Sequence, residues 1–150
     1  MKQNTLRYIF LVFCFSFTQI VNAQGIIKDD FLINDDAGSA DQFSPSISMD
    51  AVGNFVVVWY DFRNDNWDIY FQRYNSTGSV LGVNTKVNDD AGTAKQWDPS
   101  ISIDAAGNFV VVWIDERNVN RDIYYQRYTS TGAALGVNTL VNDDASTPDK

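Results

Sequence analysis

The chain repeats itself at a spacing of 54 residues, without an insertion or a deletion. When residues 34–87 are aligned with residues 88–141, 39 of the 54 positions are identical, and a third copy begins at Asn142. A fixed period of about 50 residues is typical of repeat architectures, in which each unit buries its apolar faces only against its neighbours. The repeat therefore constrains the fold strongly, and it says little about a ligand.

The first 23 residues have the pattern of a secretory signal peptide. Lys2 and Arg7 give a positively charged start, and residues 8–17 form a short apolar core. Ala23 ends a small-residue segment, so we expect cleavage before Gln24. The expected location is therefore secreted or at the cell surface.

Two alternatives to a cleaved signal peptide fit the sequence less well. A transmembrane anchor needs about 20 apolar residues, and this core is shorter and is followed by polar residues. Lipidation would use Cys14, the only cysteine, but the bulky Phe13 precedes it and apolar residues follow it. After cleavage we expect no membrane span, no disulfide and no thiol chemistry.

The net charge excludes some partners. Removal of residues 1–23 takes away two of the 11 basic residues and none of the 19 acidic ones, so the net charge changes from −8 to −10. Such a surface repels nucleic acid and anionic lipid. Glu116 is the only glutamate, and the abundance of Asp, Val, Ile and aromatic residues favours turns and strands over helices.

Each repeat divides into four strand candidates separated by turn residues. Ile47 and Met49 alternate with serines, which indicates a strand with one buried face. The run FVVVW at residues 55–59 is apolar throughout, which indicates a strand buried on both faces. We expect strands at residues 45–50, 54–59, 68–74 and 80–87, with copies at 99–104, 108–113, 122–128 and 134–141. No segment of the mature chain has a convincing helical pattern.

Four antiparallel strands per unit, with an inner strand buried on both faces, predict stacked sheets and hence an all-β fold of β-propeller blades. A β-solenoid has shorter coils, and an immunoglobulin-like repeat needs about 100 residues. The expected organisation is a signal peptide (1–23), an N-terminal strand segment (24–33), blade 1 (34–87), blade 2 (88–141) and the truncated start of a third repeat (142–150). Two blades cannot close a ring, so we expect further blades in a longer chain or head-to-tail self-assembly.

Two motifs carry a family resemblance. The string WYDFRNDNWDIYFQRY at residues 59–74, copied at 113–128, resembles the D-R-(N/D)-x-x-x-D-I-Y signature of TolB-type propeller blades. The preceding residues 48–59 are similar to the Asp-box of sialidase-like propellers, with one additional residue before Gly53. The whole unit resembles tandem repeats of secreted and surface proteins of bacteria, notably Bacteroidetes. This resemblance implies a propeller fold, which hosts enzymes, lectins and docking platforms alike.

Charged residues flank the hairpin between the second and third strands in both repeats. Because both copies keep them while neighbouring positions differ, we expect a structural brace, in which carboxylates hold an arginine. A ligand-binding arginine is the alternative. The brace residues are Asp61, Arg63 and Asp68, with copies Asp115, Arg117 and Asp122.

The differing positions are the better candidates for ligand binding. Trp67 and its counterpart Arg121 lie in the hairpin, and Phe43 and its counterpart Trp97 precede the first strand. An exposed aromatic ring at such a position can stack on a sugar or a peptide ring. By contrast, we expect Trp59 and Trp113 to be buried between adjacent sheets.

The repeated NDDAG segment is a candidate calcium site. Clustered carboxylate oxygens are the ligands that Ca²⁺ prefers, and the candidates are Asp35, Asp36, Asp89 and Asp90. The spacing does not match an EF-hand loop, and a turn between blades is the alternative interpretation. We expect no other cofactor.

The residue types disfavour an enzyme. The chain has no histidine, and no cysteine after cleavage, which excludes histidine-based triads and the common zinc sites. The leading hypothesis is a non-catalytic secreted or cell-surface module for binding and scaffolding, with a protein or glycan ligand. The alternative is a fragment of a sialidase-like glycan-processing enzyme whose catalytic residues lie outside this segment.

Overall fold

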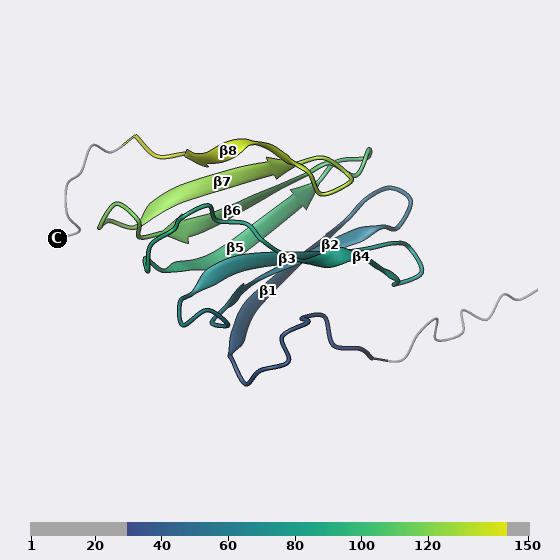
Figure 1. Cartoon of the computed structure of the whole chain (residues 1–150). Helices are drawn as coiled ribbons and strands as arrows, with labels where there is room; N and C mark the ends of the chain where they lie inside the picture. Colours follow the sequence, from purple (N-terminus) through teal and green to yellow (C-terminus); the bar gives the residue numbers. More distant parts are fainter. Residues whose placement is uncertain (1–29, 144–150) are drawn as a thin grey trace, which may run out of the picture.

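The structure, a computed structural model, describes residues 30–143 (Figure 1). The expected signal peptide and residues 144–150 of the third repeat lie outside this range. The strands are β1 (Gln42–Met49), β2 (Phe55–Asp61), β3 (Asp68–Tyr74), β4 (Val80–Lys86), β5 (Gln96–Ile103), β6 (Phe109–Asp115), β7 (Asp122–Tyr128) and β8 (Ala134–Leu140).

Each repeat forms one antiparallel sheet of four strands in sequence order, β1-β2-β3-β4 and β5-β6-β7-β8, which we call sheet 1 and sheet 2. The part of the chain that the structure describes contains no helix. The prediction of an all-β fold with four strands in each repeat is therefore confirmed. No helix that is long and apolar enough to span a membrane occurs in residues 30–143.

The strand bounds differ from the expected ones at β1 and β5, which begin before the prolines that were expected to start them. The pairing of β1 with β2 shifts register between Phe43 and Ser46, and Ser44 has a φ of 48°. Such a bulge accommodates Pro45, which has no N–H for the ladder. β3 and β7 have the expected bounds.

The expected N-terminal strand segment over 24–33 is wrong for its described part, because residues 30–33 are not in a strand. Residues 24–29 lie outside the description. Instead of pairing at an edge, residues 31–33 lie over one face of sheet 1. Ile33 packs against the buried cluster there, and its carbonyl accepts a hydrogen bond of 3.2 Å from the Tyr74 hydroxyl.

The two faces of each sheet have different neighbours. We call the face that carries Trp59 or Trp113 the front face, and the face that carries Val58 or Val112 the back face. The back face of sheet 1 packs on the front face of sheet 2, and the core between them contains Val56, Val58, Ile69, Phe71, Phe109, Val111, Trp113, Tyr124 and Tyr128. The sheets therefore stack in the same direction.

Aromatic rings connect the sheets across this core. The Phe71 ring lies 5.1 Å from that of Phe109 and 4.9 Å from that of Tyr128, in both cases edge to face. Burial of one such side chain contributes about 1.5–3 kcal/mol, and the edge-to-face geometry adds about 0.5–1.5 kcal/mol per pair. The contact between the repeats is thus a hydrophobic core of the kind found within a domain.

Both tryptophans are buried as expected, but only Trp113 has the expected location between the two sheets. Trp113 is 1% exposed and lies between the sheets. Trp59 is 3% exposed but lies on the front face of sheet 1, where Ile33 and Phe55 pack against its cluster. The two residues occupy equivalent faces of successive sheets, and only the front face of sheet 2 meets another sheet in the described chain.

Candidate functional site

The hairpin between β2 and β3 is held by an arginine and an aspartate. Arg63 Nη2 donates to Asp61 Oδ2 at 2.8 Å, and Arg63 Nη1 donates to Asp35 Oδ1 at 2.7 Å. The guanidinium carbon lies 4.3 Å from the centre of the Tyr70 ring. Because Asp35 lies in the segment that enters the repeat, this arginine ties the entering chain to sheet 1.

The same brace recurs in the second repeat. Arg117 bonds Asp115 at 2.8 Å and Asp89 at 2.7 Å, and its guanidinium lies 4.3 Å from the Tyr124 ring centre. Asp115 is fully buried, and its other donors include Trp113 Nε1 at 2.9 Å. A charge this deeply buried is stable only when it is paired and hydrogen-bonded. These residues therefore hold the fold rather than face an open site.

Asp68 and Asp122 belong to a different contact from the one expected. Asp68 is bonded by Lys86 Nζ at 2.9 Å and by Asn88 Nδ2 at 2.8 Å, and it has no bond to Arg63. Asn88 Nδ2 also donates to Gln96 Oε1 of the next sheet at 2.8 Å. Asp68 therefore anchors the connection between the repeats. In the second repeat, Asp122 accepts from Asn142 Nδ2 at 3.0 Å.

The brace lowers the pKa of two buried carboxyls, Asp61 and Asp115. Burial raises the pKa of the Asp61 carboxyl, but hydrogen bonds from Arg63 and Trp59 outweigh burial and leave that pKa below its usual value. Asp115 has the same opposing contributions and the same lowered pKa. Hydrogen bonding to Asp61 raises the pKa of the Arg63 guanidinium further above neutrality.

Acid is expected to destabilise the chain through these two carboxylates. A carboxyl whose pKa is lower in the folded state stabilises the fold above its unfolded pKa of 3.8, and that stability is lost as the pH falls through the folded pKa. The midpoint of urea denaturation should therefore be lower at about pH 3 than at about pH 6. Equal midpoints at both pH values would contradict the lowered pKa values of Asp61 and Asp115.

The calcium candidates already have protein partners. Asp35 and Asp89 bind the two brace arginines. Asp36 Oδ1 accepts from Gly38 N at 3.0 Å, and Asp90 Oδ1 accepts from Gly92 N at 3.1 Å, so both close local turns. Among residues 30–143 there is no group of three or more His, Cys, Asp or Glu that could hold a metal ion. The geometry matches the alternative interpretation, a turn between the repeats.

Several of the positions at which the repeats differ lie together at one edge of each sheet. In repeat 1, Phe43 from the start of β1 meets Trp67 from the hairpin at 5.7 Å between ring centres. Tyr60 and Phe62 lie 5.1 and 4.8 Å from Trp67. We call these four residues the aromatic tip. Phe43 is 48% exposed and Phe62 is 37% exposed, so the tip presents ring surface to solvent.

The equivalent edge of repeat 2 has a different chemistry. The Arg121 guanidinium lies 4.9 Å from the centre of the Trp97 ring, and Arg121 Nε approaches Glu116 Oε1 at 3.4 Å. The two edges are adjacent, since Ser44 Oγ lies 3.4 Å from Asp98 Oδ1. The four candidate ligand-binding residues therefore form two contacts, one in each repeat. Trp67 contacts Phe43, and Arg121 contacts Trp97.

Sequence reasoning missed Tyr60 as a member of the tip. Its position differs between the repeats, where Ile114 is the counterpart, and this difference was the available signal. Its place in a strand expected to be buried concealed it. The register pairs Tyr60 with Phe43, which puts its ring beside Phe43 at the C-terminal end of β2.

Comparison of the chain with protein-family models and with curated proteins finds no match.

Proposed function

We propose that the chain is a secreted or cell-surface module built from β-propeller blades, and that it acts as a non-catalytic binding and scaffolding unit for a glycan or protein ligand. The observation that carries this proposal is a difference in location between residues that the repeats share and residues in which they differ. Arg63, Asp61 and their copies, which both repeats share, hold the fold, whereas several side chains that differ between the repeats lie together at one exposed edge.

The stacking of the sheets supports the assignment to propeller blades. Both sheets have four antiparallel strands in sequence order, and they stack in the same direction. They approach each other most closely along β1 and β5, the first strand of each. Sheets arranged around a central axis converge along their innermost strands in this way.

The use of the polar residues supports a non-catalytic role. The fully buried carboxylates Asp61 and Asp115 are each held by an arginine and a tryptophan N–H. Their pKa values are lowered, which keeps both ionised near neutral pH and suits neither to donate a proton. An identical pair in each repeat is what a brace requires, and a unique reaction centre has no need of it.

The aromatic tip supports a glycan as the ligand. Four rings from β1, β2 and the following hairpin form one partly exposed apolar surface, and Asp41 and Asp65 are exposed close to it in the sequence. A pyranose ring offers apolar C–H groups for the ring faces and hydroxyls for nearby carboxylates and carbonyls. The acidic surface disfavours nucleic acid as the alternative.

The test is a glycan array followed by titration of the bound glycan against Trp67→Arg. This variant carries the residue that repeat 2 has at the same position, so the hairpin should fold normally. Loss of an aromatic stack worth about 0.5–1.5 kcal/mol should weaken binding by about threefold to tenfold.

The matched control for this titration is Val83→Ala, which changes an exposed residue on β4 and should leave the affinity unchanged. If Trp67→Arg binds as tightly as the unmodified chain, the aromatic tip is not the binding surface. An array on which no glycan binds above background would contradict a glycan ligand.

A further inference from the structure

The two outer faces of the stack are copies of the two faces that meet inside it. Inside, the back face of sheet 1 packs on the front face of sheet 2. Outside, the back face of sheet 2 and the front face of sheet 1 lack a sheet neighbour in the described chain. Each free face is therefore the equivalent, one repeat away, of a face that is occupied.

The free back face of sheet 2 has the residues that bind a sheet elsewhere in the same chain. Val110, Val112 and Ile123 are identical to their counterparts in sheet 1. Those counterparts, Val56, Val58 and Ile69, all lie in the core between the sheets. Ile69 is 0% exposed, whereas Ile123 is 39% exposed. A second sheet on this face would bury the side chains that the first contact already buries.

The free front face of sheet 1 has the complementary residues. Ile47 and Phe55 are identical to Ile101 and Phe109, which pack in the core between the sheets. Ile47 is 60% exposed, although its counterpart Ile101 is half-buried. The chain thus carries both halves of one apolar contact on opposite ends of its stack.

The segment before β1 does not block this contact. Residues 31–34 are the equivalents of residues 85–88, and Ile33 corresponds to Val87. Val87 lies in the core between the sheets, and Ile33 packs in the same manner over the front face of sheet 1. Residues 31–34 therefore occupy the position on sheet 1 that residues 85–88 occupy on sheet 2, where they are compatible with a packed sheet.

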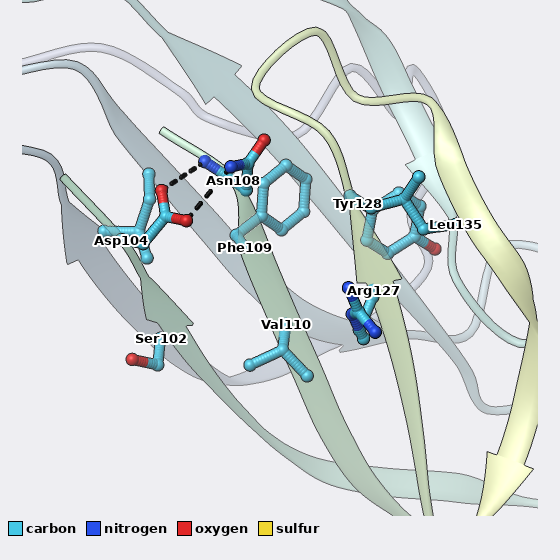
Figure 2. Close-up of a pocket in the computed structure, with 9 residues that line it drawn as sticks. Ser102, Asp104, Asn108, Phe109, Val110, Arg127, Tyr128 and Leu135 are labelled. Atoms are coloured by element: carbon cyan, nitrogen blue, oxygen red, sulfur yellow. Dashed lines mark hydrogen bonds between the residues drawn. The ribbon is translucent and has the colours of Figure 1, made fainter. Parts of the chain in front are cut away.

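The contact between the sheets also includes a hydrogen bond from an arginine, Arg73. Between the repeats, Arg73 Nη1 donates to the carbonyl of Ser130 at 2.6 Å. Its counterpart Arg127 lines a pocket on sheet 2 with Phe109, Tyr128 and Leu135 (Figure 2). Within residues 30–143, the Arg127 side chain is exposed and its guanidinium has no hydrogen-bond or ion-pair partner. The residue equivalent to Ser130 is Ser76, so the carbonyl of Ser76 in another copy is the matching acceptor.

We propose that the chain associates head to tail: the back face of sheet 2 in one copy binds the front face of sheet 1 in the next. The contact repeats the one between the sheets, with Val112 and Ile123 against Ile47 and Arg127 against the turn at Ser76. Because the two surfaces differ, the contact is heterologous and propagates until the rotation closes a ring. It requires no ligand, so it stands apart from the binding role proposed for the aromatic tip.

The test uses the full chain, produced in a host that exports it, and light scattering during size-exclusion chromatography over a wide range of concentration. The unmodified chain should form multimers whose mass rises with concentration. Ile123→Asp and Ile47→Asp each place a charge on one of the two free faces, at positions exposed enough for the fold to survive. Each variant alone should be monomeric, with an unchanged circular dichroism spectrum.

A mixture of the two variants gives the decisive result. Each variant keeps one intact face, so an equimolar mixture should form a dimer and nothing larger. Val119→Asp is the matched control, because Val119 is exposed at the β6–β7 hairpin and repeat 1 already carries Asp65 there; this variant should assemble like the unmodified chain.

Three results would overturn the proposal. If the unmodified chain remains monomeric at every concentration, the free faces bind something other than a second copy. If either variant alone still assembles, association does not need both faces. If the mixture remains monomeric while both variants are folded, the two faces do not bind each other.

Discussion

Replacement of Trp113 by alanine is expected to lower the free energy of unfolding by about 3–5 kcal/mol. Trp113 is 1% exposed and lies in the core between the two sheets, so the change opens a cavity against side chains of both repeats. It also removes the N–H that donates to the buried Asp115 at 2.9 Å. Urea denaturation followed by circular dichroism measures the loss.

Two further alanine variants calibrate this result. Trp59→Ala removes the equivalent residue of repeat 1, where the entering segment rather than a sheet covers the front face. Its cost should be smaller, because less of the surrounding structure depends on it. Trp97→Ala removes a half-buried tryptophan that contacts Arg121, and it should cost less than Trp113→Ala. A loss below about 1 kcal/mol for Trp113→Ala would mean that this residue is accessible and that the sheets do not pack on it.

Replacement of Asp115 by alanine should destabilise the chain by a similar amount, about 3–5 kcal/mol. The carboxylate is fully buried and accepts hydrogen bonds from Trp113, from Arg117 and from Gln96 Nε2. Removal leaves these donors without their acceptor and leaves the Arg117 charge only partly compensated by Asp89. The same urea denaturation measures the effect.

The control for Asp115→Ala is Asp65→Asn, which removes an exposed charge and keeps a residue type that tolerates the φ of 58° at this position. Its effect should lie within about 0.5 kcal/mol of zero. A double variant of Asp115 and Arg117 should lose less than the two single losses combined, because the residues act on one contact. Additive losses would show that the brace is not a coupled unit.

Much of the fold could be predicted from the sequence, because the signal was local and was repeated. The alternation around Ile47 and the continuous apolar run after Phe55 specified a half-buried and a fully buried strand. The bulge after Phe43 could not be predicted in the same way. Its positive φ falls on Ser44 in one repeat and on Asp98 in the other, and neither residue signals that conformation as glycine does.

The position of Trp59 shows a second limit of the repeat argument. Equivalence between repeats predicts equal burial, but it does not say which repeat has a neighbour on a given face. Sequence alone could not place residues 31–33 over the front face of sheet 1, since this contact depends on the fold of β2 and β3. The apolar character of Phe31 and Ile33 was read as a strand for the same reason.

The candidate site was predictable in its residue types and not in its pairings. The shared arginines were expected to bind a nearby aspartate, and both Asp61 and Asp68 were candidates for Arg63. The structure separates them, because Asp61 lies beside Arg63 and Asp68 faces Lys86 and the next repeat. Asp35 could not be assigned to the brace from local sequence, since its partner is 28 residues away.

The central claim is that the two repeats form sheets stacked in the same direction, back face to front face. Nuclear Overhauser contacts of the Phe71 ring, observed with selectively labelled phenylalanine, test this most directly. We predict contacts from Phe71 to the rings of Phe109 and Tyr128, whose centres lie 5.1 and 4.9 Å away. A Phe71 ring with contacts only to residues of its own repeat would contradict the stacking and the roles inferred from it.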